Sequence, residues 1–371
     1  MCFRLGPLIP PRISELPNKS ISFTLNRPRS LNALTYEQVQ ILYKALREVQ
    51  DDTKCPAVLL SGIGDRAFCA GGDVLHIAES AASGSDWNRR WFSSEFLLNY
   101  MIANFQKPVI SLWKGIVMGG GVGISVYGSH RIATDTTIFA MPETSIGFFP
   151  DVGASYFLSH YVKPPGLGLY LGMTGHRLNG GDTVLCGLAT HYVPQSRTEE
   201  LFKVLGTSDD VVRTVSEYSV TPPIFTLTTD LLESIKQYFH ESTDCFETFF
   251  NSLQTGEQRG DEFAISTMKA LRSKCPLTVR VWFESYKLGS QQALSDVLER
   301  EYHMCIQVTE ADSTNFREGV RATLIDKGRG DPPHYVPQRI EDVTQEMVDR
   351  VIRSTIGGDI GSCIRSGKLM Y

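Results

Sequence analysis

The apolar pattern in the first half of the chain predicts short buried strands that alternate with helices. Residues 20–25 alternate between apolar and polar positions and predict a first strand. Thr35 is the expected N-cap of a helix, Gln38 completes a capping box, and the helix should end near Val49. Residues 56–61 and 108–113 are continuous apolar runs, which are typical of strands buried on both faces.

The order of these predicted elements repeats along the chain. A strand, a turn, a short extended piece and a helix follow one another from Pro56, again from Pro108, and again from Arg131 through Glu143. Successive units of this kind predict an α/β fold built as a spiral of strand-strand-helix turns rather than a flat doubly wound sheet. A formal G-x-G-x-x-A match at residues 62–67 leads into a second chain reversal, whereas a dinucleotide site requires a helix there.

Helical periodicity replaces the strand-like runs from about Ser196. The helical segments expected in this part are residues 227–239, 262–271, 294–308 and 316–325. We therefore predict an N-terminal extension at residues 1–18, a spiral core at 19–199 and a mostly helical region at 200–371. The extension contains Arg4 and Arg12 with no acid before Glu15, as short transit segments do, but its prolines fit a floppy N-terminus equally well.

The composition narrows the class of protein. A net charge of −5 without a basic run argues against a dedicated nucleic-acid binder. No apolar run approaches the roughly 20 residues that a membrane-spanning helix needs. The eight cysteines form no C-x-x-C pair and are expected to be reduced, buried thiols, and the histidines show no metal-ligand spacing, so no metal site is expected.

A glycine cluster after the strand at 108–113 carries the first hint of chemistry. Gly119, Gly120, Gly121 and Gly123 run into an apolar segment, which predicts a helix whose first amides are unobstructed and suit a developing negative charge. Gly72 and Gly120 could supply two backbone N–H donors from separate turns to a reacting carbonyl oxygen. They could equally serve only tight turns and close packing.

Three acids are candidates for acting on that carbonyl. Glu143 could be a general base or a nucleophile, or else an exposed acid in a loop. Asp151 precedes an apolar helical pattern and, by pattern alone, is better explained as an N-cap than as a catalytic group. Glu95 lies on a predicted helix and, taken alone, would be interpreted as a surface acid.

Several motifs together resemble the crotonase (enoyl-CoA hydratase/isomerase) superfamily, and within it the hydrolase branch that acts on 3-hydroxyisobutyryl-CoA. The matching stretches cover nearly all of residues 20–330. They are Asn26-Arg27-Pro28, Leu31-Asn32-Ala33-Leu34, Ala67-Phe68-Cys69-Ala70-Gly71-Gly72-Asp73, Met118-Gly119-Gly120-Gly121-Val122-Gly123, Ala140-Met141-Pro142-Glu143-Thr144, Gly147-Phe148-Phe149-Pro150-Asp151-Val152-Gly153 and Phe316-Arg317-Glu318-Gly319-Val320-Arg321-Ala322.

The resemblance implies a spiral core that binds an acyl-CoA and holds its carbonyl with the amides of Gly72 and Gly120. Glu143 matches the shared catalytic glutamate. Gly123 falls where hydratases carry a second catalytic glutamate, whereas Asp151 matches an aspartate typical of the hydrolases. Glu95 matches a substrate-contacting acid. The substrate-binding set implied by the resemblance is Ala70, Glu95, Gly120, Glu143 and Asp151.

The function that the resemblance implies is hydrolysis of the 3-hydroxyisobutyryl-CoA thioester in valine degradation, in the mitochondrion or else the cytosol. Coenzyme A enters as part of the substrate, so no separate cofactor is expected, and the resemblance allows a homo-oligomer. Two alternatives stay open: an enoyl-CoA hydratase or isomerase, and a non-catalytic protein of this fold such as a mitochondrial ribosome component.

Overall fold

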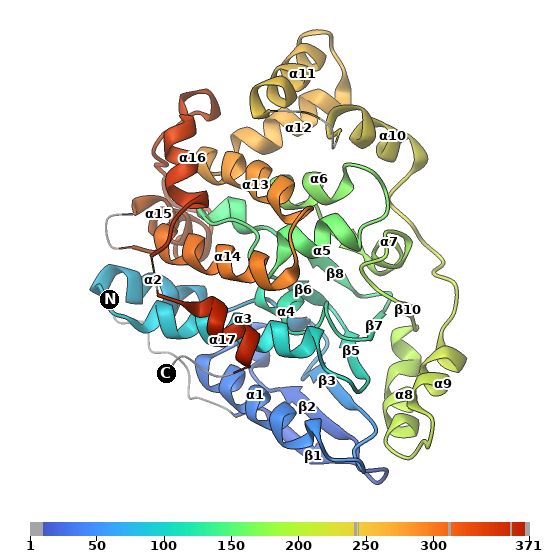
Figure 1. The fold of residues 1–371 in the computed structure, drawn as a ribbon. Coiled ribbons are helices and arrows are strands. Elements are labelled where there is room, and N and C mark those ends of the chain that lie inside the picture. The colour runs from blue at the N-terminus through green and yellow to red at the C-terminus, as the bar shows by residue number, and fades with distance from the viewer. Residues whose placement is uncertain (1–9, 241–242, 244, 311–312, 357, 368–371) are drawn as a thin grey trace.

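The computed structural model describes residues 10–367 apart from 241–242, 244, 311–312 and 357, and its strands form two sheets (Figure 1). The first has the order β1-β2-β3-β5-β7-β10 and the second the order β4-β6-β8-β9. The strands are β1 (Arg12–Glu15), β2 (Ile21–Leu25), β3 (Val58–Gly62), β4 (Ala67–Cys69), β5 (Val109–Trp113), β6 (Ile116–Met118), β7 (His130–Ala133), β8 (Ile138–Ala140), β9 (Leu178–Asn179) and β10 (His191–Tyr192).

The predicted spiral is confirmed by how the chain moves between these sheets. In each of three successive units the first strand (β3, β5, β7) lies in the larger sheet and the second (β4, β6, β8) in the smaller one. Within each sheet these strands pair in parallel with the strand one unit on. Strand β1, which pairs antiparallel with β2, was not predicted; the first nine residues of the expected extension lie outside the described residues.

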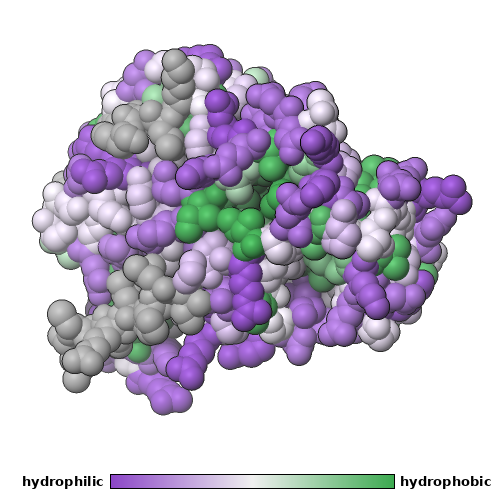
Figure 2. Space-filling model, turned by 90° about the horizontal axis from the view of Figure 1, so that it is seen from below, coloured by the Kyte–Doolittle hydropathy of each residue, from purple (hydrophilic) through white to green (hydrophobic). Residues whose placement is uncertain are grey.

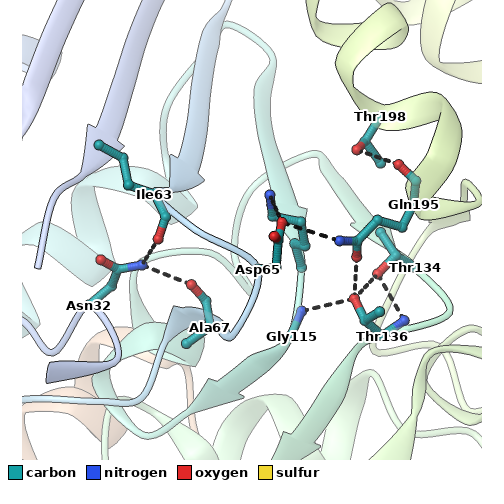
Figure 3. A network of polar contacts seen from close by, with 10 residues as sticks. Asn32, Ile63, Asp65, Ala67, Gly115, Thr134, Thr136, Gln195 and Thr198 are labelled. Carbon is teal, nitrogen blue, oxygen red and sulfur yellow. Dashed lines mark hydrogen bonds and ion pairs between the residues drawn. The ribbon is translucent and has the colours of Figure 1, made fainter. Parts of the chain in front are cut away.

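Side chains tie the turns of successive units together (Figure 3). Asp65, between β3 and β4, accepts hydrogen bonds from Lys114 Nζ at 3.0 Å and Gln195 Nε2 at 3.4 Å. The amide of Gly115, between β5 and β6, donates to Thr136 Oγ1 at 3.3 Å, and that hydroxyl bonds Gln195 in turn. These contacts hold the three chain reversals in one stack. The short strands β4, β6 and β8, which begin at these reversals, therefore lie side by side.

Asn32 fixes the first of these reversals from the inside. Its buried amide nitrogen donates to the carbonyls of Ile63 at 3.1 Å and Ala67 at 2.8 Å, as Figure 3 shows. Its oxygen accepts from the amide of Arg27 at 2.9 Å. Asn32 has a left-handed φ of 57°, which asparagine tolerates better than most residues. The result is a fixed path into β4 and on to Gly72.

The strands of the larger sheet are buried on both faces, as their apolar runs predicted. Val58 and Leu60 of β3 belong to the main hydrophobic core, whereas Leu59 points into a second, smaller cluster. Two helices that lie beside this sheet in Figure 1, α8 (Thr198–Leu205) and α9 (Val211–Tyr218), contribute Leu201 and Val215 to that smaller cluster. A strand with both faces covered has no polar positions to alternate with apolar ones.

The helices of the first part surround the sheets. The expected capping box is present: the Gln38 amide donates to Thr35 Oγ1 at 3.3 Å, and the Thr35 amide donates to Gln38 Oε1 at 3.0 Å. The helices are α1 (Tyr36–Gln50), α2 (Val74–Ser83), α3 (Trp87–Ala103), α4 (Gly120–Gly123), α5 (Ala154–His160), α6 (Leu167–Thr174), α7 (Gly180–Leu185), α8 (Thr198–Leu205) and α9 (Val211–Tyr218).

The second part of the chain contains helices in the described residues and no strand. Helix α14 lies against α3 and α5, α13 against α5 and α6, and α15 against α2 (Figure 1). The helices are α10 (Thr229–Tyr238), α11 (Phe246–Gln258), α12 (Glu262–Arg272), α13 (Pro276–Gly289), α14 (Leu294–Val308), α15 (Thr314–Val320), α16 (Gln345–Ile352) and α17 (Ile360–Ser366). All four predicted helical segments are present, although the last divides into α15 and a π-helical turn at Arg321–Ile325.

The surface is mostly hydrophilic on the face shown in Figure 2, where hydrophobic residues gather near the middle and hydrophilic ones surround them. Among the described residues, no helix is both long and apolar enough to cross a membrane. The same residues contain no group of three or more His, Cys, Asp or Glu side chains that could hold a metal ion.

Candidate active site

A cavity of about 750 Å³ brings the predicted site residues together. Its wall is formed by the turn after β4, the middle of α3, the start of α4, and the segment that follows β8. The predicted residues that line it are Ala70, Gly72, Glu95, Gly120, Glu143 and Asp151. The sequence reasoning therefore identified residues that are far apart in the chain and adjacent in space.

The amides of Gly72 and Gly120 lie close to each other on the cavity wall. A Cβ built on Gly120 would be 3.2 Å from the Gly72 nitrogen. Neither nitrogen donates a hydrogen bond within the described part of the chain. Gly120 is the first residue of α4, so its amide has no acceptor within the helix. The bridge between Leu34 and Gly72 is formed by the carbonyl of Gly71 and the amide of Asp73, which leaves the Gly72 amide free. Two free donors at one point of a cavity suit an oxygen that gains negative charge.

Close packing also requires glycine at both positions, so the two interpretations of these glycines are compatible. A Cβ on Gly72 would lie 2.7 Å from the ring of Trp91, and one on Gly120 would overlap Glu95 Oε1. Any side chain at Gly120 would thus displace a carboxylate of the site.

Glu143 is buried rather than exposed in a loop, so that alternative is wrong. It opens a short 3₁₀ helix, Glu143–Ile146, directly after Pro142, and only 7% of its surface is exposed. Its Oε1 lies 3.1 Å from where a Cβ of Gly119 would be, and its Oε2 has no partner among the described residues. Burial raises the pKa of Glu143 well above its usual range, and the neighbouring Asp151 raises it further.

Asp151 does not cap the helix that follows it, so the N-cap interpretation is wrong. The N-cap of α5 is Gly153, and the Asp151 side chain makes no capping hydrogen bond. Val152 and Gly153 have left-handed φ angles of 54° and 77°, which separate Asp151 from the helix and leave its carboxyl group on the cavity wall. Its exposed fraction is 7%; burial raises its pKa well above the usual range, and Glu301 adds to this.

Glu95 is 2% exposed, so it is no surface acid. A signal in the sequence pointed this way: α3 carries Trp91, Phe92 and Phe96 around Glu95, and a helix that is apolar on most faces is a buried one. Glu95 Oε1 has no partner in the described chain. Burial raises the pKa of Glu95 well above its usual range, and Asp151 contributes further.

These three buried carboxyl groups line one cavity, and Asp151 disfavours ionisation of both Glu95 and Glu143. Carboxyls in such a group titrate together, and some stay protonated where an isolated carboxyl would be charged. The arrangement can therefore supply both an ionised carboxylate, as nucleophile or base, and a protonated carboxyl, as proton donor.

Gly123, on the first turn of α4, leaves no space for a further acid. A Cβ there would lie 2.7 Å from Val152 Cβ and 2.9 Å from Val152 Cγ1. Real Cβ atoms do not approach other carbons this closely, and Val152 is fully buried. The turn that presents Asp151 thus occupies the volume that a side chain at Gly123 would need.

Sequence reasoning missed several functional candidates. Trp91 lines the cavity, and its buried Nε1 has no partner among the described residues. Cationic side chains from separate parts of the chain also line the cavity, and the fold brings them together: Arg27 and Arg29, Arg66, Arg177 and Lys327. Glu301, from the helical region, gave no signal in the sequence beyond lying on a predicted helix.

Comparisons with known proteins agree with this architecture. The family model for enoyl-CoA hydratase/isomerase matches residues 21–352. A probable 3-hydroxyisobutyryl-CoA hydrolase of Arabidopsis thaliana is 40% identical over 337 residues, covering 88% of this chain and 87% of its own. The mitochondrial 3-hydroxyisobutyryl-CoA hydrolase of Danio rerio is 35% identical over 356 residues, covering 92% and 88%.

Solved structures of acyl-CoA enzymes have the same fold. A carnitinyl-CoA dehydratase from Mycobacterium thermoresistibile has a TM-score of 0.82 at 32% identity, covering 92% of this chain and 96% of its own. An enoyl-CoA hydratase from Rhodobacter sphaeroides has a TM-score of 0.83 at 29% identity, covering 97% and 99%. The chain belongs to the enoyl-CoA hydratase/isomerase family.

Proposed function

We propose that the protein hydrolyses the thioester of 3-hydroxyisobutyryl-CoA to 3-hydroxyisobutyrate and free coenzyme A. The observation that carries the proposal is the pair of buried carboxyl groups, Glu143 and Asp151, on one cavity wall with the free amides of Gly72 and Gly120. The names of the relatives, which are hydrolases of this thioester, support the choice of acyl group.

In the proposed reaction the two amides donate hydrogen bonds to the thioester carbonyl oxygen as it becomes negatively charged. Glu143 either attacks the carbonyl carbon to form a mixed anhydride or removes a proton from an attacking water. The carbon–sulfur bond breaks, and the leaving thiolate takes a proton from a carboxyl that burial keeps protonated, for which Asp151 is suited. In the first route, water then cleaves the anhydride. Losing one amide donor should cost on the order of 3 kcal/mol.

The acyl chain and the coenzyme would contact different parts of the wall. Glu95 and Asp151 offer acceptors to the 3-hydroxyl, and Ala70 lines the path of the thioester. The cationic side chains at the cavity, such as Arg66 and Lys327, suit the phosphates of coenzyme A, which enters as part of the substrate. The proposed reaction calls for no metal and no further cofactor.

Two other functions make different demands on the site. A hydratase of this family would need a second glutamate, and Val152 fills the space beside Gly123. A scaffold protein would have no need for buried, unpartnered carboxylate oxygens, which cost stability unless a ligand satisfies them. Both points favour the hydrolase.

The test is the release of free thiol from 3-hydroxyisobutyryl-CoA by the purified protein, with crotonyl-CoA and acetyl-CoA in parallel. Fast release confined to the hydroxyacyl thioester is expected. Hydration of crotonyl-CoA without thiol release would identify a hydratase instead. A folded protein that is inactive on all three thioesters would favour the scaffold function.

We also propose a mitochondrial location and a role in valine degradation, because several relatives from animals are named mitochondrial. Fusing residues 1–18 to a fluorescent protein tests whether they direct import. A cytosolic signal from both this fusion and the full chain would contradict the proposal. The division at residues 199/200 and a homo-oligomer remain predictions; limited proteolysis tests the first, and light scattering the second.

A further inference from the structure

Helix α14 places a fully buried carboxylate behind the turn that carries Asp151. Glu301 is 0% exposed and accepts three hydrogen bonds. The donors are the amide of Gly153 at 2.7 Å, the amide of Ser155 at 3.2 Å and the hydroxyl of Ser155 at 2.7 Å. Glu301 lies about 150 residues after Asp151 in the sequence and is not among the residues that line the cavity.

These contacts replace the helix cap that the sequence predicted for Asp151. The first amides of α5 have no partners within the helix and need an acceptor. Glu301, from another helix, accepts from the amide of the N-cap residue Gly153 and from the amide of Ser155 in the first turn. The amide of Ala154 donates to the main-chain carbonyl of Asp151 at 2.9 Å. The side chain of Asp151 is therefore not needed for capping, and its carboxyl group is available to the cavity.

The hydrogen-bond directions fit an ionised Glu301. Two of the donors are backbone amides, which can only donate. Arg300 Nη2 donates to Ser155 Oγ at 3.0 Å, which leaves the hydroxyl proton of Ser155 to point at Glu301. Burial raises the pKa of Glu301, and Arg300 together with these three donors opposes the rise.

The turn between Asp151 and α5 needs such support. Val152 is β-branched and has a φ of 54°, a strained conformation that such residues rarely adopt. Tyr127 donates its hydroxyl hydrogen to the Val152 carbonyl at 2.8 Å, and Glu301 holds the amide of the next residue. The turn is thus fixed from both sides at the two positions that set the direction of Asp151.

We propose that Glu301 is a positioning residue for the hydrolysis: by capping α5 in place of the Asp151 side chain, it fixes the turn that directs the Asp151 carboxyl into the cavity. The negative charge of Glu301 also acts on that carboxyl, as a secondary electrostatic component. This inference rests on the proposed function for its kinetic consequences. The capping itself rests on hydrogen bonds alone.

The charged and titratable groups around Asp151 define the secondary electrostatic component. Glu301 raises the pKa of Asp151, after burial itself. The other titratable groups that interact with Asp151 are Glu143 from the 3₁₀ helix, Glu95 from α3, Cys305 from α14, and Tyr127 from the segment after α4. The cation Arg300 acts on Glu301. Removing the charge of Glu301 should therefore lower the pKa of Asp151.

Three variants separate charge from geometry. Glu301→Gln keeps the size and one acceptor oxygen but loses the charge, whereas Glu301→Asp keeps the charge and shortens the side chain. Glu299→Gln is the matched control, because Glu299 lies on the same helix but is paired at the surface with Arg365 at 3.2 Å. Thermal unfolding confirms that each variant is folded.

The first measurement is the pH dependence of kcat/KM for 3-hydroxyisobutyryl-CoA. Glu301→Gln should lower kcat about 10- to 100-fold and move the alkaline limb to lower pH by roughly one unit. Glu301→Asp should keep the limb in place with a smaller loss of kcat, and Glu299→Gln should match the wild type. A folded Glu301→Gln variant with the wild-type kcat and limb would overturn the proposal, and a loss of kcat without a shift would overturn its charge component.

A second measurement does not depend on activity. Carbon-13 NMR of aspartate-labelled protein, with the Asp151 signal assigned through Asp151→Asn, reports the titration of this carboxyl directly. Glu301→Gln should move its midpoint to lower pH, and Glu299→Gln should not. An inactive wild-type protein in which Glu301→Gln causes this shift would refute the proposed function alone, whereas an unchanged midpoint would refute the effect of the Glu301 charge on Asp151.

Discussion

The contact between Gly123 and Val152 gives a quantitative test of how the site is built. In Gly123→Ala the new Cβ would be 2.7 Å from Val152 Cβ, whereas carbon atoms in contact prefer 3.5–4.0 Å. About 1 Å of movement is needed, and Val152 is held by Tyr127 on its carbonyl and Glu301 on the following amide. Overpacking of this kind costs about 1–3 kcal/mol, and the better helix propensity of alanine returns about 1.

The consequence for activity follows from the position of Val152. Because it directly follows Asp151, a movement of about 1 Å at Val152 reaches the Asp151 carboxyl, and misplacement by this distance can cost about 100-fold in kcat. Val152→Ala alone removes two buried methyl groups, worth about 0.8 kcal/mol each in transfer free energy. In the double variant the smaller side chain at position 152 leaves space for the methyl group added at position 123.

The assay is a double-mutant cycle on the free energy of unfolding in urea and on kcat. We expect the loss of stability in Gly123→Ala/Val152→Ala to be at least about 1 kcal/mol smaller than the sum of the two single losses, with kcat partly restored. Additivity within about 0.5 kcal/mol, together with a wild-type kcat in Gly123→Ala, would refute the conclusion that Val152 fills this space.

Three further predictions concern the carboxyl groups and the indole. Glu143→Gln should lower kcat by about 10²- to 10⁴-fold and leave the Kd for coenzyme A nearly unchanged; near-normal turnover would exclude Glu143 as base or nucleophile. Trp91→Phe removes a buried N–H that has no partner among the described residues, and it should lower kcat/KM for the hydroxyacyl thioester about tenfold more than kcat/KM for a thioester that lacks the hydroxyl. An equal loss for both thioesters would show that the indole serves packing only. Burial raises the pKa of Glu143, so the folded wild type binds more protons than the unfolded chain. The contribution of protonated Glu143 to the free energy of unfolding is therefore full below about pH 4 and is lost as pH rises through the folded pKa. Urea titrations should therefore show Glu143→Gln gaining stability relative to wild type as pH rises, by up to about 1.4 kcal/mol per pH unit, and a constant difference would contradict the raised pKa.

Most of the local structure could be predicted from the sequence, because it is determined by residues close together in the chain. The capping box of α1, the doubly buried strands and the three repeated units all depend on residues within a few positions of each other. Strand β1 was missed, because four exposed residues at a sheet edge carry no apolar pattern. Its register against β2 comes from the sheet rather than from its own sequence.

The environments of the acids could not be predicted from local pattern. Asp151 has the spacing of an N-cap, and only the left-handed pair Val152–Gly153 removes it from that role. The acceptor that takes its place, Glu301, comes from a helix far along the chain. Family resemblance identified Asp151 as a candidate, but the physical reason for its availability lies in this long-range contact.

The predicted boundary near residue 200 marks a change in secondary structure rather than a break in packing. One hydrophobic core contains residues from both sides of it, from Phe23 to Ile364. The turns that carry the two candidate catalytic acids are also held by the later part: the Cys275 amide donates to the Thr144 carbonyl at 2.9 Å, beside Glu143, and Glu301 holds the turn after Asp151. A chain ending at residue 199 would therefore expose this core and release both acids, so the helical region is needed for the site itself and does more than cover it.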